Sequence, residues 1–264
     1  MSVERAVPGE ADWTELAAPH LARYLFAAES AAGLRVLDAG CGAGYGVCLL
    51  RSAGAASVRG IDCDSAAIEL ARSRYGSDRT EFVVDDCQSL TASPGPFDLI
   101  CCFENIEHLP RPEAFLAAAA SRMSPHGRLL VSTPDRAVSE PYVAGRPRNP
   151  FHVQEWYRDE FQRLLQRYFC QVELRVQIQT AAVAQRQAAV EALRQGLTWA
   201  NPLTIFLWRK LARGPDGRRS WKGLQGLAAS SPGDWPIVPQ AMAPLLGIGH
   251  FHVAICSQPR QPVQ

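Results

Sequence analysis

The stretch that most constrains the fold is VLDAGCGAGYG, residues 36–46. An apolar run ends in an aspartate, glycine then occupies every second position, and a helical pattern follows. Glycines allow a tight turn between a strand and a helix, and they let a ligand approach the main chain closely. Taken alone, this spacing fits either a nucleotide-binding loop or a simple tight turn, so the context of the stretch must decide.

The context is an alternation of short apolar runs with helical patterns from about residue 15 to residue 175. Asp64 is the expected N-cap of one of these helices. The expected strands are 34–38, 57–62, 81–84, 97–103, 127–132 and 171–177, and the expected helices are 17–28, 45–53, 65–75, 112–123 and 155–168. This order predicts an α/β fold with a doubly wound parallel sheet and helices on both faces.

After residue 132 the pattern changes. Residues 134–151 are rich in Pro, Gly and Arg and are expected to form a long loop, of a length that is often functional. We expect one domain over residues 1–264, in which residues 180–249 form a helical cap inserted before a last strand at 250–258. Within that cap, residues 203–213 have a basic and an apolar face, which suits either packing on the domain or peripheral contact with a membrane, carrier or partner.

The composition narrows the class of protein. The chain has 264 residues, is 47% hydrophobic and carries a formal net charge of +1, so its overall charge gives no sign of a nucleic-acid partner. No apolar run reaches the roughly 18 residues of a spanning helix, and no signal peptide is recognisable. The eight cysteines form no CxxC pair and indicate buried thiols in a reducing compartment. We therefore expect a cytoplasmic protein.

Acidic residues stand at the ends of two further expected strands, Asp62 after the second and Asp86 with Cys87 after the third. Ligands of open α/β sheets bind at the carboxyl ends of the strands. There, an aspartate can accept hydrogen bonds from ribose hydroxyls or from an adenine amino group, although either residue alone could simply begin a turn. A dinucleotide is disfavoured, because its site requires GxGxxG rather than glycine at every second position.

With these features in place, the sequence resembles the class I S-adenosylmethionine-dependent methyltransferases. The segments that carry the resemblance are HLARYLFAA, VLDAGCGAGYG, GIDCDSAAIELA, FDLICCFENIEHL, GRLLVSTPD and NPFHVQEW. They cover about residues 18–176 and are most similar to the subgroup of ubiquinone-type O-methyltransferases and bacterial enzymes that methylate glycans and natural products. The resemblance implies a Rossmann-like sheet of seven strands with an antiparallel last strand, and S-adenosylmethionine as cofactor.

The same resemblance assigns roles to particular residues. The glycine loop would approach the methionine part of the cofactor, Asp62 the ribose, and Asp86 with Cys87 the adenine. Arg23 and Tyr24 would close over the methionine carboxylate, unless Tyr24 simply packs inward from an amphipathic helix. The full set of expected cofactor-binding residues is Arg23, Tyr24, Gly40, Cys41, Gly42, Asp62, Cys63, Asp86, Cys87 and Phe103.

The segment CFENIEHLP places Glu104, Glu107 and His108 directly after the fourth strand. If the chain turns helical there, these side chains fall on one face, at i, i+3 and i+4. Together with His152 they would suit a divalent metal ion such as Mg²⁺, Mn²⁺, Fe²⁺ or Zn²⁺. The pattern is also similar to the metal site of small-RNA terminal 2′-O-methyltransferases. Without a metal, His108 or His152 is the expected general base, Glu104 a cofactor contact or helix cap, and Glu107 a solvated residue.

The sequence therefore predicts an S-adenosylmethionine-dependent O-methyltransferase, assisted by a divalent metal, that acts on a hydroxyl group. The expected acceptor is a small molecule or glycan: a sugar, a glycoside or a polyhydroxylated natural product. Three alternatives stay open, namely methylation of an RNA 3′-terminal ribose, N-methylation of a small amine, and a catalytically silent cofactor-binding scaffold. The near-neutral charge disfavours the RNA substrate.

Overall fold

The structure is a computed structural model that describes residues 13–139, 142, 145–181, 183–184, 231–242 and 247–260. Most of the expected cap, including residues 203–213, lies outside these residues. In the part of the chain that is described, no helix combines the length and the apolar character needed to cross a membrane.

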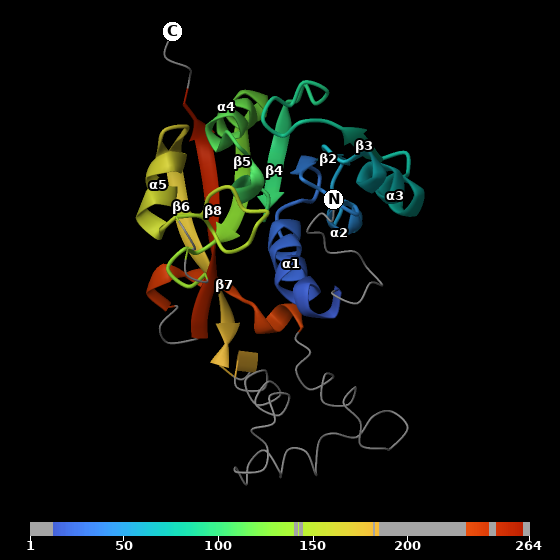
Figure 1. Cartoon of the computed structure of the whole chain (residues 1–264). Coiled ribbons are helices and arrows are strands. Elements are labelled where there is room, and N and C mark those ends of the chain that lie inside the picture. Colours follow the sequence, from blue (N-terminus) through green and yellow to red (C-terminus); the bar gives the residue numbers. More distant parts are fainter. Residues whose placement is uncertain are drawn as a thin grey trace, which may run out of the picture.

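One sheet of eight strands organises the molecule, in the order β3-β2-β1-β4-β5-β8-β6-β7 (Figure 1). The strands are β1 (Arg35–Ala39), β2 (Ser57–Asp62), β3 (Thr80–Val84), β4 (Phe97–Phe103), β5 (Met123–Pro134), β6 (Phe169–Thr180), β7 (Ile237–Pro239) and β8 (Gly247–Pro259). Strands β1 to β5 pair in parallel with one another, whereas β8 is antiparallel to both β5 and β6. The expected doubly wound α/β fold with an antiparallel last strand is confirmed.

Helices cover both faces of this sheet. They are α1 (Trp13–Ala28), α2 (Tyr45–Ser52), α3 (Ser65–Tyr75), α4 (Pro112–Arg122) and α5 (Arg158–Gln166), with 3₁₀ turns η1 (Ile106–His108), η3 (Pro232–Asp234) and η4 (Gln240–Met242). Alternate residues of β4 divide between two cores: Leu99 and Cys101 pack with α1, α2 and α3, while Ile100 and Cys102 pack with α4 and α5. A strand buried on both faces explains why its sequence is apolar from Leu99 to Phe103 rather than alternating.

Two differences from the expected fold concern the C-terminal half. An eighth strand, β7, pairs its three residues with β6 at the edge of the sheet, where only a helical cap was expected. Helix α5 begins at Arg158 rather than at residue 155, because Trp156 pairs with Asp135 across an isolated bridge and keeps that segment extended. Asp64 caps α3 as expected, since its side chain accepts a hydrogen bond from the Ala66 backbone N–H over 2.8 Å.

The sheet order fixes where a ligand can bind. From β1 the chain runs outward through β2 and β3, and it then returns to the other side of β1 as β4. The two connections therefore diverge between β1 and β4, which opens a crevice at the carboxyl ends of these strands. The glycine loop after β1 and the segment after β4 both lie at this point.

Candidate active site

A cavity of about 320 Å³ opens at this crevice. Seven of the ten expected cofactor-binding residues line it, namely Tyr24, Gly40, Cys41, Gly42, Asp62, Cys63 and Phe103. Five lining residues were not expected from the sequence: His20, Ala43, Tyr45, Asn105 and Phe151. Ala43 and Tyr45 lie within the glycine-rich stretch 36–46, and Asn105 is the second residue after β4, so their position in or next to these motifs was a signal that could have identified them.

Gly40 has a backbone that only glycine adopts readily, with φ +84°. A Cβ at this position would lie 2.5 Å from Cγ of Asn105, which is too close for a non-bonded contact. The N–H groups of Gly40 and Cys41 donate to the Ile61 carbonyl over 2.9 and 2.8 Å, and this holds the loop against β2. The loop is therefore held between Asn105 and β2, and its residues Gly40, Cys41 and Gly42 line the cavity.

Asp62 connects the glycine loop to the end of β2. Its Oδ2 accepts a hydrogen bond from the Gly42 backbone N–H over 3.0 Å, and its Oδ1 accepts one from the Asp64 N–H over 2.9 Å. The carboxylate also lines the cavity, so it keeps lone pairs for ligand hydroxyl groups.

Tyr24 reaches from α1 beneath the glycine loop. Its hydroxyl lies 3.0 and 3.1 Å from the two carboxyl oxygens of Asp38. Both groups are buried, and this burial raises the pKa of Asp38 to about 7. The Asp62 charge adds to the rise, whereas the Tyr24 hydrogen bond opposes it. Burial and the neighbouring Asp38 also raise the pKa of Tyr24 well above its ordinary value, so its hydroxyl stays protonated and donates.

Three expected cofactor residues do not line this cavity. Arg23 is fully buried and turns toward the far half of the sheet, where it donates to Gln177 Oε1 over 2.5 Å and lies over the Phe251 ring. The Asp86 side chain is exposed and accepts from the Gln88 backbone N–H, while Cys87 is buried in the core.

Glu104 leaves β4 in a left-handed conformation, with φ 49°. Its Oε1 accepts from the Ser132 hydroxyl over 2.7 Å and lies 3.8 Å from Nη1 of Arg23. Because the 3₁₀ turn begins only at Ile106, the expected helical face shared by Glu104, Glu107 and His108 does not form. Glu104 lines the cofactor-sized cavity instead.

The other three expected metal ligands do meet. One ligand atom from each of Glu107, His108 and His152 lies within 4.8 Å of the other two. The two imidazole rings stand nearly perpendicular, with centroids 5.0 Å apart. Residues from a turn after β4 and from the long loop after β5 thus converge, although 44 positions separate the two histidines in the sequence.

Glu107 is the buried member of this cluster, with 1% of its surface exposed. Burial and the nearby Glu104 charge raise its pKa well above the ordinary value. The Thr133 hydroxyl faces the carboxyl group, yet neither side chain has a partner in hydrogen-bond geometry among the described residues. A buried carboxyl group without a donor requires an explanation, and a cation is one that native proteins use.

His108 is oriented by the chain itself. Its Nδ1 lies 2.9 Å from the Phe151 carbonyl oxygen, and a carbonyl can only accept. Nδ1 therefore carries the proton in the neutral ring, and Nε2 carries the lone pair. The Val153 N–H donates to the Glu107 carbonyl over 2.8 Å, so the long loop that carries His152 is fixed to the turn that carries Glu107 and His108.

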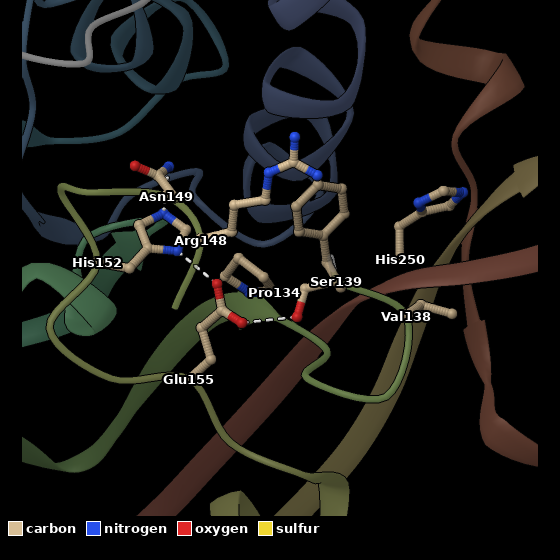
Figure 2. Close-up of a pocket in the computed structure, with 9 residues that line it drawn as sticks. Pro134, Val138, Ser139, Arg148, Asn149, His152, Glu155 and His250 are labelled. Carbon is tan, nitrogen blue, oxygen red and sulfur yellow. Dashed lines mark hydrogen bonds and ion pairs between the residues drawn. The ribbon is translucent and has the colours of Figure 1, made fainter. Parts of the chain in front are cut away.

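A second cavity, of about 470 Å³, lies on the other side of His152 (Figure 2). Its lining residues are Pro134, Val138, Ser139, Arg148, Asn149, His152, Glu155, His250 and Phe251. Glu155 is 4% exposed, and its Oε1 lies 2.7 Å from Nδ1 of His152. The sequence interpretation missed Glu155; the available signal was a carboxylate three residues after a histidine in the long loop.

Comparison with known proteins identifies the family to which the chain is similar. A family model described as a methyltransferase domain matches residues 12–175. A Mycolicibacterium smegmatis protein named "Probable S-adenosylmethionine-dependent methyltransferase" is 35% identical over 172 residues, which are 64% of this chain and 65% of that protein. A "Ubiquinone biosynthesis O-methyltransferase" of Xanthomonas campestris pv. campestris is 39% identical over 150 residues, 51% of this chain and 61% of that one. These matches span less than two thirds of the curated relatives.

The fold has solved counterparts. The crystal structure of a SAM dependent methyltransferase from Archaeoglobus fulgidus superposes with a TM-score of 0.55 at 18% identity, and the alignment covers 93% of this chain and 94% of that one. At this identity the similarity supports the sheet and its helices, and the details of the site depend on the residues described above.

Proposed function

Because the chain belongs to the class I S-adenosylmethionine-dependent methyltransferases, we propose that it is an O-methyltransferase assisted by a divalent cation at Glu107, His108 and His152. The proposed acceptor is a hydroxyl group of a sugar, glycoside or polyhydroxylated natural product. The observation that supports this proposal best is the position of the two histidines: His108 lines the 320 Å³ cavity beside the glycine loop, and His152 lines the second cavity.

The residues of the first cavity suit S-adenosylmethionine. Gly40 and Gly42 bring main chain without a side chain to the cavity wall, and Asp62 offers a carboxylate of the kind that ribose hydroxyls bind. When bound, the cofactor supplies a methyl group on a positively charged sulfur, ready for in-line displacement. The protein's part is to hold the nucleophile and that carbon in line, which is the main source of rate in such a transfer.

The cluster suits a cation by its donor set. It combines one buried carboxyl group without a hydrogen-bond donor and two imidazoles, one of which is shown by its backbone contact to present a lone pair. Two nitrogen ligands and one oxygen ligand favour Mn²⁺, Fe²⁺ or Zn²⁺ over Mg²⁺. A divalent cation in this position lowers the pKa of an adjacent hydroxyl group and fixes its orientation.

The second cavity suits the acceptor. Its lining combines polar or charged side chains with the apolar side chains of Pro134, Val138 and Phe251. A volume of about 470 Å³ lies within the usual range for small-molecule sites, roughly 300–1,000 Å³. A hydroxylated ring fits such walls, since its hydroxyl groups can meet the polar side chains and its apolar face the apolar ones.

The proposal is tested with labelled S-adenosylmethionine and three acceptor pools: sugars with polyhydroxylated aromatics, small amines, and short single-stranded RNA. The assay is run with Mn²⁺ and with EDTA, on wild type, His152→Ala and the surface control Glu113→Gln. We expect transfer to a member of the first pool, lost with EDTA and in His152→Ala while cofactor binding is retained. Transfer to amines that EDTA does not affect would contradict the proposal, and so would transfer to RNA alone.

A further inference from the structure

Glu104 is a carboxylate in the cavity beside the glycine loop, and the cation cluster leaves it without a role. It lines this cavity directly after β4, while Asp62 lines it at the end of β2. We propose that Glu104 binds the amino group in the methionine part of S-adenosylmethionine. This role rests on the proposed cofactor site and on neither the cation nor the acceptor.

The backbone of Glu104 is held in an uncommon conformation. Its φ of 49° lies in the left-handed region, which residues other than glycine rarely adopt. The Glu104 backbone N–H faces Ser132 on β5, with the Ser132 carbonyl oxygen 3.3 Å and the Ser132 hydroxyl 3.2 Å away. Strained backbone persists only where its surroundings hold it, and it occurs most often at ligand sites. The turn at Glu104 therefore points to a functional side chain rather than to a simple strand end.

The two carboxyl oxygens of Glu104 have different surroundings. Oε1 accepts a hydrogen bond from the Ser132 hydroxyl over 2.7 Å and lies 3.8 Å from Nη1 of the buried Arg23. Oε2 accepts no hydrogen bond from the described residues, and it is not one of their enclosed polar atoms. Since the side chain is 11% exposed and lines the cavity, Oε2 is the oxygen that a ligand can reach.

The positions of the two carboxylates indicate which part of the cofactor meets Glu104. Strand β1 lies between β2 and β4, so the ends of β2 and β4 are two strand spacings apart, roughly 10 Å. With the ribose hydroxyls at Asp62, the methionine part extends across the glycine loop toward β4. The far end of that part carries a carboxylate, which Glu104 repels, and a positively charged amino group with three N–H donors. The amino group is therefore the one that suits Oε2.

The first test compares two ligands that differ only in this amino group. One is S-adenosylhomocysteine, which remains of the cofactor after methyl transfer, and the other is its analogue with hydrogen in place of the amino group. Affinities are measured by calorimetry with EDTA present, so that no cation contributes. We expect wild type to bind the analogue roughly tenfold more weakly, or worse, because a hydrogen bond between charged groups is lost. Equal affinities for the two ligands would overturn the proposal without the use of any variant.

The second test repeats both titrations with Glu104→Gln, which loses the charge but keeps an oxygen for the Ser132 hydroxyl. We expect S-adenosylhomocysteine to bind roughly tenfold more weakly than to wild type, and the analogue to bind with nearly unchanged affinity. Glu113→Gln is the matched control, because Glu113 is exposed on α4 and does not line the cavity.

Two results of the second test overturn the proposal. An equal loss of affinity for both ligands would give Glu104 a structural role, and wild-type affinity for both would give it none in binding. These results differ from a failure of the cofactor site itself, in which wild type binds neither ligand and the role of Glu104 falls with that site.

Discussion

Asp38 gives a quantitative prediction, because it is a buried acid next to the glycine loop. Its carboxyl group is fully buried, and Tyr24 is the only side chain whose hydrogen bond to it is observed among the described residues. Burial and the Asp62 charge raise its pKa from 3.8 to about 7, against the effect of the Tyr24 hydrogen bond. The folded protein therefore holds this proton at pH values where the unfolded chain has lost it.

The sign of the effect on stability follows directly. Between pH 3.8 and about 7 the folded state binds more protons at Asp38 than the unfolded state, so the free energy of unfolding falls as pH rises. The stability that protonated Asp38 contributes begins to fall as pH rises above the pKa of Asp38 in the unfolded chain, and it is fully lost above its pKa in the folded protein. A difference of about three pH units corresponds to roughly 4 kcal/mol.

The perturbation is Asp38→Asn, which keeps the shape of the side chain and an oxygen for the Tyr24 hydroxyl but has no charge to bury. Unfolding in urea is measured from pH 4 to pH 8 for both proteins. We expect the stability of the variant, relative to wild type, to rise by up to about 4 kcal/mol over this range. A relative stability that does not change with pH would refute the reasoning.

Asp98→Asn is the matched control. Burial raises the pKa of Asp98, but hydrogen bonds from the Arg35 backbone, Ser124 and the Arg35 side chain, together with the Arg35 charge, lower it overall. The stability that Asp98 contributes is fully present above its unfolded pKa of 3.8 and is lost only as pH falls through its lowered folded pKa. The relative stability of this variant is therefore expected to stay nearly constant above about pH 5, where that of Asp38→Asn still rises.

Two further substitutions test the cofactor cavity. Gly40→Ala places a Cβ 2.5 Å from Asn105 Cγ, at a backbone φ of +84°. We therefore expect the affinity for S-adenosylmethionine, measured by calorimetry, to fall at least tenfold; unchanged affinity would show that the loop adapts. Tyr24→Phe removes the hydroxyl that donates to Asp38. We expect urea denaturation at neutral pH to show a free energy of unfolding about 1–3 kcal/mol lower than in wild type. An equally stable variant would mean that this hydrogen bond contributes nothing to stability.

The fold could be predicted from the sequence because its signals are local. Strands buried on both faces are mostly apolar, and the bounds of β2, β4 and α3 agree with the predicted ones. The eighth strand had no such signal, since β7 consists of three residues in a proline-rich segment and depends on the distant β6 for its hydrogen bonds.

The site was less predictable, because backbone turns and distant partners decide where side chains point. Glu104 was expected on a helical face, but its left-handed backbone turns it toward Ser132 and Arg23. Arg23 was expected at the cofactor, yet its partner Gln177 lies 154 positions away. The roles proposed for the cofactor-binding and metal-binding residues stay predictions, with the geometry described above as their support.

The most direct test of the proposed cation site is a count of bound ions. The chelator-treated protein is dialysed against Mg²⁺, Mn²⁺, Fe²⁺ without oxygen, or Zn²⁺, and the metal content per chain is measured by mass spectrometry for wild type and Glu107→Gln. The account predicts about one transition-metal ion per wild-type chain and much less in the variant, because the amide lacks the carboxylate charge. Equal content in the two proteins, or no bound ion with any of the four metals, would contradict it.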